Sequence, residues 1–446
     1  TKGVDYEEAS ILVLIAATLQ FARPCFYRKT ALTAQLGSAR SLGIIAAVLA
    51  LPGWIVFFAY RHVDYQNDLW WQFAWSGDAS RSLRAIFAAC VLIVATLIYR
   101  LQSQGMSYRP ETIVKEDVEA ALSQSSRTDA MLALTGDKRL LWSASGEAML
   151  LYQIQGQSWI LMGDPVGKRE EWADLLWQMR EKADREQGRL LIYQLSMEAV
   201  PVAIDMGLQL IKYGEEAVVA LPDFTLDGPD MKSLRYAVNR AEREGASFEI
   251  VGKTEVPSLL PQLRAISDEW LRAKNQTEKA FSIGRFDSSY MSQFDIAVVR
   301  QHGRIVAFAN IWATANREEL SIDLMRHADD MPYGSMDYLF ARLMLWGKAN
   351  GYAAFNLGLA PLSGLEARRL APIWTKAGAF LFRHGEALYG FEGLRAYKEK
   401  FCPQWRPRYI AGPHGIGFGR ALVDLQTLIN GGGRSAARRA NLMLVA

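Results

Sequence analysis

Two uncharged apolar runs near the start of the chain constrain its fold more than any other feature. The first is Leu42–Tyr60, and the second is Ala85–Tyr99, which arginines flank. About 20 apolar residues cross a bilayer as a helix, and terminal arginines can snorkel to the interface. The loop between the runs is rich in tryptophan, which suits a membrane–water boundary. We therefore expect a membrane region at residues 1–110 with two transmembrane helices, at about 42–60 and 84–100. The alternative is a pair of buried core helices.

The distribution of basic residues predicts the orientation of these spans. Arg28 and Lys29 precede the first run, and Arg100 and Arg109 follow the second, whereas the short connecting loop carries acidic as well as basic residues. The positive-inside rule therefore favours both outer flanks in the cytoplasm. The rest of the chain would then be cytoplasmic, which agrees with an unpaired Cys402.

The overall composition excludes several classes of protein. The 446 residues include 50 Lys plus Arg and 47 Asp plus Glu, a net formal charge of +3, and 50% are hydrophobic. This is too apolar for a disordered chain and too nearly neutral for a general nucleic-acid coat, so a polyanion would need a local basic patch. Three widely separated cysteines and five histidines without an HExxH pattern predict neither a disulfide framework nor a metal site.

From about Lys115 the composition is globular, and the order of predicted elements occurs twice. Strand-like runs are followed by a helix, a strand, a helix and a strand. The first copy comprises Arg139–Ser143, Ala148–Ile154, Trp159–Met162, the helix Glu170–Glu186, Leu190–Leu195, a short helix and Gln209–Tyr213; the second comprises Ile296–Val299, Ile305–Ile311, Leu320–Leu324, the helix Met336–Ala349, Ala354–Leu357, the helix Leu365–Lys376 and Ala379–Phe382. We predict an α/β protein with a mixed sheet in two acyltransferase-type domains, at 114–228 and 229–411, and a C-terminal helix and basic tail at 412–446.

A basic stretch joins the two copies. Lys232, Arg235, Asn239 and Arg243 are spaced so that they share one face of a helix. One interpretation is a basic ridge that contacts RNA phosphates. The other is an ordinary solvated helix face, because Glu242 and neighbouring acids dilute the charge.

The segment SIDLMRH (Ser321–His327) places charged residues at the end of a strand. Strict alternation would put Asp323 on the face opposite Ile322 and Leu324. Asp323 and Arg326 could hold an ammonium and a phosphate respectively, or they could pair with one another.

Three further segments carry polar residues in turns or on a helix face. They are FSIGRFD (281–287), where Arg285 could bind an anion; FNLGLAPLSGLEARR (355–369), a strand-to-helix turn; and FEGLRAYKEKF (391–401), a helix with an apolar stripe. The turn lacks the Q/R-x-x-G-x-G/A loop that cradles acetyl-CoA. No Ser-His-Asp order or nucleotide loop stands out, so an enzyme of this sequence would depend on positioning and electrostatics.

The stretch YGFEGLRAYKEKFCPQWRPRYIA (Tyr389–Ala411) resembles the end of the multiple peptide resistance factor family, the aminoacyl-phosphatidylglycerol synthase/flippase proteins. LTGDKRLLWS, WILMGDPVG, FSIGRFD, SIDLMRH and FNLGLAPLSGLEARR also match, so the resemblance covers roughly residues 114–411. It implies a tandem acetyltransferase-like (GNAT-type) fold on the cytoplasmic side of the bacterial inner membrane, attached to a multi-pass membrane domain. It further implies transfer of an amino acid, lysine rather than alanine in most members, from aminoacyl-tRNA to phosphatidylglycerol.

The same resemblance implies the partners and the role in the cell. No cofactor is expected. The partners would be aminoacyl-tRNA, phosphatidylglycerol, membrane lipids and the remainder of the flippase domain, with homo-oligomers left open. Modified lipid would confer resistance to cationic antimicrobial peptides. Two spans alone should not be credited with lipid flipping.

Asp323 and Arg326 are carried over by motif, the other site residues follow from their position and charge in the matching segments, and the resemblance favours the basic helix as a tRNA contact. The catalytic group is Asp323, Arg326, Lys398 and Glu386; the substrate-binding group is Arg285, Asn356, Ser363, Glu366 and Arg395; the tRNA-binding group is Lys232, Arg235 and Arg243. Asp323 would recognise the α-ammonium of the amino acid and Arg326 a phosphate. Two alternatives remain: a peptidoglycan-type tRNA-dependent aminoacyltransferase, and a non-enzymatic membrane-tethered RNA-binding module.

Overall fold

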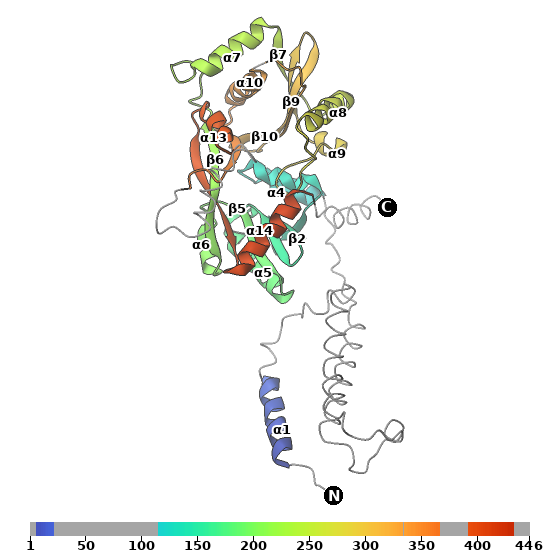
Figure 1. The fold of residues 1–446 in the computed structure, drawn as a ribbon, viewed down its shortest axis with the longest axis vertical. Coiled ribbons are helices and arrows are strands. Elements are labelled where there is room, and N and C mark those ends of the chain that lie inside the picture. Colours follow the sequence, from blue (N-terminus) through green and yellow to red (C-terminus); the bar gives the residue numbers. More distant parts are fainter. Residues whose placement is uncertain (1–5, 22–114, 333, 366–390, 432–446) are drawn as a thin grey trace, which may run out of the picture. The chain divides into compact units, whose positions relative to one another are not determined.

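The computed structural model describes residues 6–21, 115–332, 334–365 and 391–431 (Figure 1). The chain divides into two compact units, and the smaller one contains residues 1–110. Its described residues form the helix α1 (Tyr6–Phe21). Both predicted membrane spans lie outside the described residues. Within the described ranges, no helix combines the length and the apolar character that crossing a membrane requires.

The larger unit is built on one mixed sheet of 12 strands. Their order in space is β1-β2-β3-β5-β12-β6-β11-β10-β9-β8-β7, and β4 pairs with β2 beside this path. Neighbouring strands are antiparallel except for the parallel pairs β3–β5 and β10–β11. The strands are β1 (Arg139–Trp142), β2 (Ala148–Gln155), β3 (Ser158–Met162), β4 (Val166–Gly167), β5 (Arg189–Leu195), β6 (Gln209–Ala220), β7 (Ala246–Val251), β8 (Ile296–Gln301), β9 (Arg304–Ala313), β10 (Glu319–His327), β11 (Ala354–Pro361) and β12 (Gln404–Gly412).

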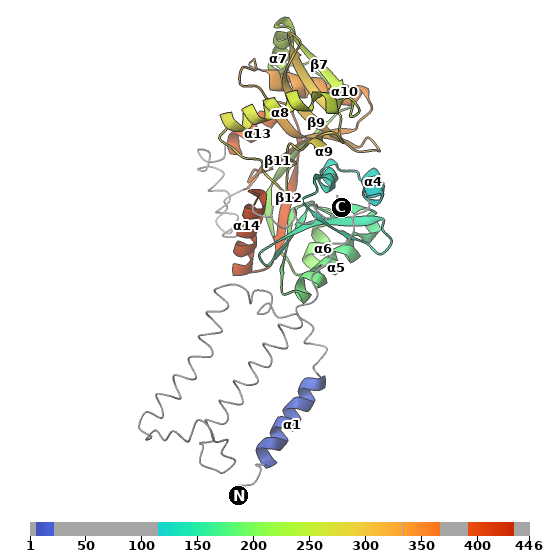
Figure 2. The same ribbon diagram turned by 90° about the vertical axis from the view of Figure 1, so that its right-hand side faces the viewer.

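Helices cover both faces of this sheet (Figures 1 and 2). They are α4 (Lys115–Ser123), the 3-10 helices η4 (Thr128–Thr135) and η5 (Arg169–Glu171), α5 (Trp172–Arg185), α6 (Val200–Asp205), α7 (Lys232–Arg243), α8 (Val256–Ala273), α9 (Ser288–Met291), α10 (Ser335–Ala349), α13 (Phe391–Glu399) and α14 (Ile416–Ile429). We call the elements from α4 to β6 the first half of this unit and those from α7 to α14 the second half. One face of the sheet carries α4, η4, α8, α9 and α14, whose apolar side chains form a cluster that runs across both halves. On the other face, α5 and α6 cover the first half, and α7, α10 and α13 cover the second.

The predicted repeat is confirmed wherever the structure describes it. The first copy runs β1–β2–β3, α5, β5, α6 and β6, and the second runs β8–β9–β10, α10 and β11. The helix predicted at Leu365–Lys376 and the strand predicted at Ala379–Phe382 lie outside the described residues. The mixed α/β class is therefore confirmed, whereas the predicted domain boundaries stay a prediction.

The two halves exchange their last strands. β6 ends the first half but pairs with β11 of the second, and β12 ends the second half but pairs with β5 of the first. β6 and β12 also pair with each other in the middle of the sheet. Because each half receives a strand from the other, the sheet is continuous from β1 to β7.

A buried ion pair fixes this exchange. The Arg408 guanidinium on β12 donates through Nε and Nη2 to Glu216 Oε2 on β6, at 3.0 and 2.5 Å. Both side chains are buried, 8% exposed each. Removing one partner of such a pair leaves an uncompensated buried charge.

We therefore expect Arg408→Ala to lower the free energy of unfolding by roughly 3–5 kcal/mol. The matched control is Arg406→Ala, an exposed arginine on the same strand, which should change it by less than about 0.5 kcal/mol. Denaturant unfolding of both variants measures the difference. Equal stabilities for the two variants would contradict this role of the ion pair.

Candidate active site

The site forms where the parallel pair β10–β11 stops being paired. Register runs from Glu319 opposite Ala354 to Ser321 opposite Asn356 and ends there. Beyond this point, β10 has an irregularity between Ile322 and Met325 against β9. Asp323 is therefore the first charged side chain past the end of the parallel ladder.

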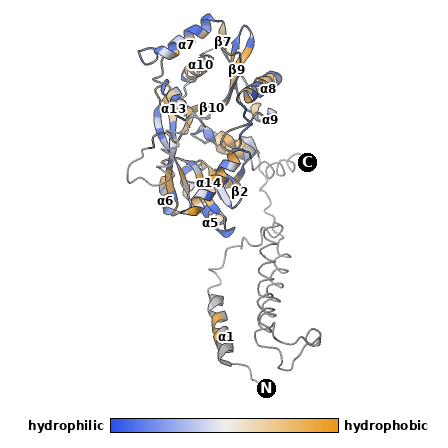
Figure 3. Cartoon of the chain, in the orientation of Figure 1, coloured by the Kyte–Doolittle hydropathy of each residue, from blue (hydrophilic) through white to orange (hydrophobic). Residues whose placement is uncertain are grey.

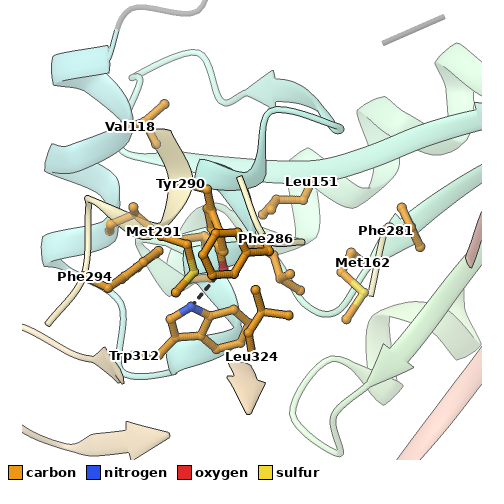
Figure 4. Packing of buried hydrophobic residues seen from close by; sticks show 14 of the residues in the cluster. Val118, Leu151, Met162, Phe281, Phe286, Tyr290, Met291, Phe294, Trp312 and Leu324 are labelled. Carbon is orange, nitrogen blue, oxygen red and sulfur yellow. Dashed lines mark hydrogen bonds between the residues drawn. The ribbon is translucent and has the colours of Figure 1, made fainter. Parts of the chain in front are cut away.

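The irregularity on β10 overturns part of the predicted alternation. Ile322 and Met325 pack in the clusters beneath α10. Leu324 instead packs with Tyr290 on the opposite face (Figure 4). Asp323 also lies on that face, because it accepts the Tyr290 hydroxyl. A bulge places two consecutive residues on one face, so the predicted separation of Asp323 from Leu324 is wrong. The Leu324 N–H that the bulge frees donates to the Asn310 side chain at 2.7 Å.

Two neutral donors hold the Asp323 carboxylate. The Tyr290 hydroxyl donates to Oδ2 at 2.7 Å, and the Gly284 N–H donates to Oδ1 at 2.9 Å. Trp312 Nε1 in turn donates to the Tyr290 oxygen at 3.2 Å, the dashed line in Figure 4. Burial raises the pKa of Asp323 to about 6, although these donors and the nearby Lys138 and Arg326 charges oppose that rise.

The loop that supplies Gly284 is tied down at several backbone positions. Ala280 N–H donates to the Ile429 carbonyl of α14 at 3.0 Å. Phe281 N–H donates to Asp137 Oδ2 at 2.8 Å. A Cβ at position 284 would collide with the Asp323 carboxylate, so this close approach requires glycine. The loop is thus held by groups from the first half as well as the second.

The first half also brings a buried ammonium to this region. Lys138 Nζ donates to Asp137 Oδ1 at 2.6 Å and to Thr135 Oγ1 at 2.9 Å, and it lies 5.7 Å from the centre of the Phe281 ring. Its side chain is 1% exposed. The sequence predicts no role for Lys138, Asp137 or Tyr290. Tyr290 bonds to Asp323 from another element, Asp137 is linked to it only through the loop that begins at Phe281, and Lys138 acts on it through its charge.

Arg326 and Asp323 do not form the pair that remained open from the sequence. Arg326 Nη2 lies 3.3 Å from Glu278 Oε2, and its guanidinium stacks 4.3 Å from the Trp270 ring centre. Burial lowers the pKa of Arg326. Arg285 is half-buried in the loop that carries Gly284. Its positive charge helps to lower the pKa of the nearby Lys138.

The residues predicted around β11 and α13 form a separate set of contacts. Asn356 Nδ2 donates to Glu319 at 3.1 Å, and Lys398 Nζ donates to the Gly358 and Leu359 carbonyls, both at 2.8 Å. Burial lowers the pKa of Lys398 to about 8. Arg395 pairs with Glu215 and stacks on Trp405, whereas the buried Ser363 hydroxyl has no hydrogen-bond partner among the described residues. Glu366 and Glu386 lie outside the described residues.

The predicted tRNA-binding residues lie on α7, away from these contacts. Figure 3 shows α7 as largely hydrophilic. Lys232 and Arg243 are exposed, while Arg235 donates to the Leu226 and Gly228 carbonyls and is half-buried. Tyr236 is 60% exposed on the same helix.

The first half contains a counterpart of Asp323 in a different electrostatic setting. Asp164 follows the last β3–β5 pair (Met162 opposite Tyr193) by the same two positions that separate Asp323 from Ser321. Asp164 is paired with Arg127, and the Ser196 N–H also donates to it. A cavity of about 890 Å³ nearby is lined by Arg127, Asp129, Glu319 and Arg408 among other residues, and Asp323 is not one of them.

This comparison indicates which carboxylate can accept a cationic ligand. Asp164 already has a guanidinium partner, whereas the bonded donors of Asp323 are neutral. A carboxylate has about four acceptor positions, and Tyr290 and Gly284 use two. Within the described residues, no group of three or more His, Cys, Asp or Glu side chains could hold a metal ion. The bonded donors of Asp323 thus leave acceptor positions of its carboxylate for a further donor.

Comparisons with known proteins agree with the sequence resemblance. The family model "Phosphatidylglycerol lysyltransferase, C-terminal" matches residues 119–412. The phosphatidylglycerol lysyltransferase of Bacillus subtilis is 36% identical over 329 residues, which are 73% of this chain and 38% of that protein. The corresponding Staphylococcus xylosus protein is 34% identical over 280 residues, 63% of this chain and 33% of that protein. The chain thus spans less than two fifths of the length of these relatives.

Two solved structures are also similar to this chain. The C-terminal domain of a putative lysylphosphatidylglycerol synthetase from Agrobacterium fabrum has a TM-score of 0.65 and 42% identity, covering 71% of this chain and 98% of that one. L-PGS from Bacillus licheniformis has a TM-score of 0.64 and 35% identity, covering 73% and 99%. Together with the match over residues 119–412, these similarities show that the chain belongs to the phosphatidylglycerol lysyltransferase (multiple peptide resistance factor) family and corresponds to the C-terminal part of its members.

Proposed function

We propose that this chain carries an aminoacyltransferase centre that moves an amino acid, lysine in preference to alanine, from aminoacyl-tRNA to phosphatidylglycerol. The observation that supports it most is the half-buried Asp323 carboxylate, which neutral donors hold at the end of the β10–β11 ladder. Both substrate classes come from the names of the relatives and from what the family resemblance implies.

The reaction needs positioning more than activation. The ester bond between the amino acid and the tRNA 3′ ribose breaks, and an ester bond to a lipid glycerol hydroxyl forms. The proton of that hydroxyl ends on the ribose oxygen. Because one ester replaces another, the exchange is near thermoneutral and requires no ATP. Bringing two large substrates together in the correct orientation and keeping water away are then the main catalytic tasks.

Asp323 is proposed to bind the α-ammonium group of the aminoacyl substrate. With a pKa of about 6, its carboxylate is mostly ionised at neutral pH. Inside an apolar cluster, a charge-assisted hydrogen bond to an ammonium is stronger than the same bond in water. Tyr290 and Gly284 fix the direction of the carboxylate, and so they would fix the position of the ester carbon.

The remaining predicted groups are proposed to act around this centre. Arg326, stacked on Trp270 and paired with Glu278, would orient the wall beside Asp323 and present positive charge to a phosphate. Arg285 in the adjacent loop is a second candidate for a phosphate. Lys398 would stiffen β11, because its ammonium bridges two carbonyls.

The cellular setting is also a proposal. The two uncharged runs at 42–60 and 85–99 and the basic residues around them support a multi-pass protein of the bacterial inner membrane with its catalytic part in the cytoplasm. There the acceptor lipid is present in the adjacent leaflet. Lipid modified in this way would reduce the negative surface charge that attracts cationic antimicrobial peptides.

We expect Asp323→Asn to abolish most lysyl transfer, by about 100-fold or more, because an amide cannot compensate the ammonium charge. Labelled lysyl-tRNA and phosphatidylglycerol vesicles measure the product lipid, and alanyl-tRNA in a parallel assay tests the amino-acid preference. Asp287→Asn, an N-cap change at α9 in the same segment, should retain activity. Full transfer by the Asp323→Asn enzyme would refute the proposed role.

Charge reversal on α7 tests the proposed tRNA surface. Lys232→Glu with Arg243→Glu should weaken tRNA binding and reduce the slope of log affinity against log salt by about two. Both side chains are exposed, so folding should be unaffected. The control is Arg272→Glu, an exposed arginine on α8. Identical salt slopes for the α7 variant and the control would count against the basic ridge.

A further inference from the structure

The turn at residues 135–138 of the first half connects to Asp323 of the second half by two routes. The first is mechanical: Asp137 Oδ2 accepts the Phe281 N–H, and three residues further along this loop the Gly284 N–H donates to Asp323. The second is electrostatic: the Lys138 ammonium lies 5.7 Å from the ring centre of Phe281, at the start of the loop that bonds to Asp323, and its positive charge favours the ionised Asp323 carboxylate. The proposed function assigns no residue of the first half a role at Asp323.

The ammonium is placed and retained by its surroundings. Its side chain is 1% exposed, so water screens its field poorly. Burial lowers the pKa of Lys138, but the contact with Asp137 opposes that shift. Asp137 Oδ1, Thr135 Oγ1 and the Phe281 ring surround the nitrogen. The Asp137 carboxylate accepts hydrogen bonds from both the Lys138 ammonium and the Phe281 N–H. One carboxylate therefore holds both the Lys138 charge and the start of the 280–284 loop.

We propose that Lys138 is a positioning residue of the active site, which keeps the Asp323 carboxylate ionised at neutral pH and, through Asp137, holds the 280–284 loop against it. This inference rests on the proposed function for its catalytic consequence. It makes the active site a joint product of both halves, because the first half supplies the charge and the second half supplies the carboxylate.

The direction of the effect follows from the groups around Asp323. Those that face it are Lys138 from the first half, Arg326 from its own strand, the Tyr290 hydroxyl from α9 and the Gly284 N–H from the loop; Arg285 and Asp137 lie beside Lys138, and Glu278 pairs with Arg326. Removing the Lys138 charge leaves the carboxylate with Arg326 as its nearby cation. The pKa of the carboxylate should then rise. If the enzyme needs the carboxylate ionised, its activity should begin to fall at a higher pH when the solution is acidified.

The test compares pH profiles of kcat/KM for lysyl transfer by the wild-type chain, Lys138→Met, Lys138→Arg and Lys253→Met, an exposed control. For Lys138→Met we expect the acidic limb to move up by about one pH unit. Lys138→Arg and Lys253→Met should keep the wild-type limb. A lowered kcat with an unmoved acidic limb would overturn the proposal, because that result indicates a structural role alone. Lys138→Gln, which can still hydrogen-bond to Asp137, carries the same expectation if Lys138→Met does not fold.

A second readout does not depend on activity. Asp323 has a folded-state pKa above its ordinary value, so its contribution to stability is present at low pH and is lost as pH rises through about 6. In Lys138→Met this loss should extend to higher pH. The extra pH dependence of Tm should disappear in an Asp323→Asn background, and its persistence there would overturn the coupling. A wild-type chain without transferase activity would refute the proposed function, while the Tm comparison would still decide the role of Lys138.

Discussion

The half-buried Asp323 carboxylate lies among aromatic side chains, where its charge has to be stabilised by the groups around it. An uncompensated charge in such a place would cost several kcal/mol, so every nearby element must supply a donor or a charge. Tyr290 on α9, Gly284 in the preceding loop and Lys138 from the first half do this for Asp323. The bulge on β10 is part of the same arrangement, because it turns Asp323 and Leu324 to one face.

The strand exchange explains how groups from two halves can meet with such precision. β12 lies between β5 and β6, so the halves share one sheet and cannot separate without breaking its central pairs. The buried pair Arg408–Glu216 fixes that centre. The two halves also differ in electrostatics: Asp164 pairs with an arginine, while the groups that donate hydrogen bonds to Asp323 are neutral.

Much of the fold could be predicted from the sequence, because local periodicity determines it. The strands around Ala148–Ile154 and Ile305–Ile311 and the helix at Met336–Ala349 follow from apolar spacing alone. β12 was not predicted, since Pro403 and Pro407 argue against a central strand. Its pairing with β5 begins only at Tyr409, so Pro407 falls where β12 pairs with β6 alone and its missing N–H costs no bond to β5.

The site was predictable only in part. The sequence indicates Asp323 because it lies among charged residues at the end of a strand. The bulge that sets its direction depends on the pairing of β9 with β10, which the sequence does not reveal. Lys138, Asp137 and Tyr290 act through contacts far apart along the chain, which periodicity cannot reveal. Arg326 was expected at the site, and its charge does stabilise the ionised Asp323 carboxylate. Its ion-pair partner Glu278, however, comes from a loop that no local sequence pattern connects to Arg326.

If Asp323 binds an ammonium group as a carboxylate, ligand binding near the pKa of Asp323 must release protons, and this release can be measured. A non-hydrolysable 3′-lysylamido adenosine can be titrated calorimetrically at pH 6 in buffers of different ionisation enthalpy. At a pH equal to its pKa, about half of the Asp323 carboxyl groups must lose a proton when the ligand binds. We expect the wild-type chain to release about half a proton and Asp323→Asn to release none. Binding heats that are independent of the buffer, with equal affinity for both proteins, would contradict it.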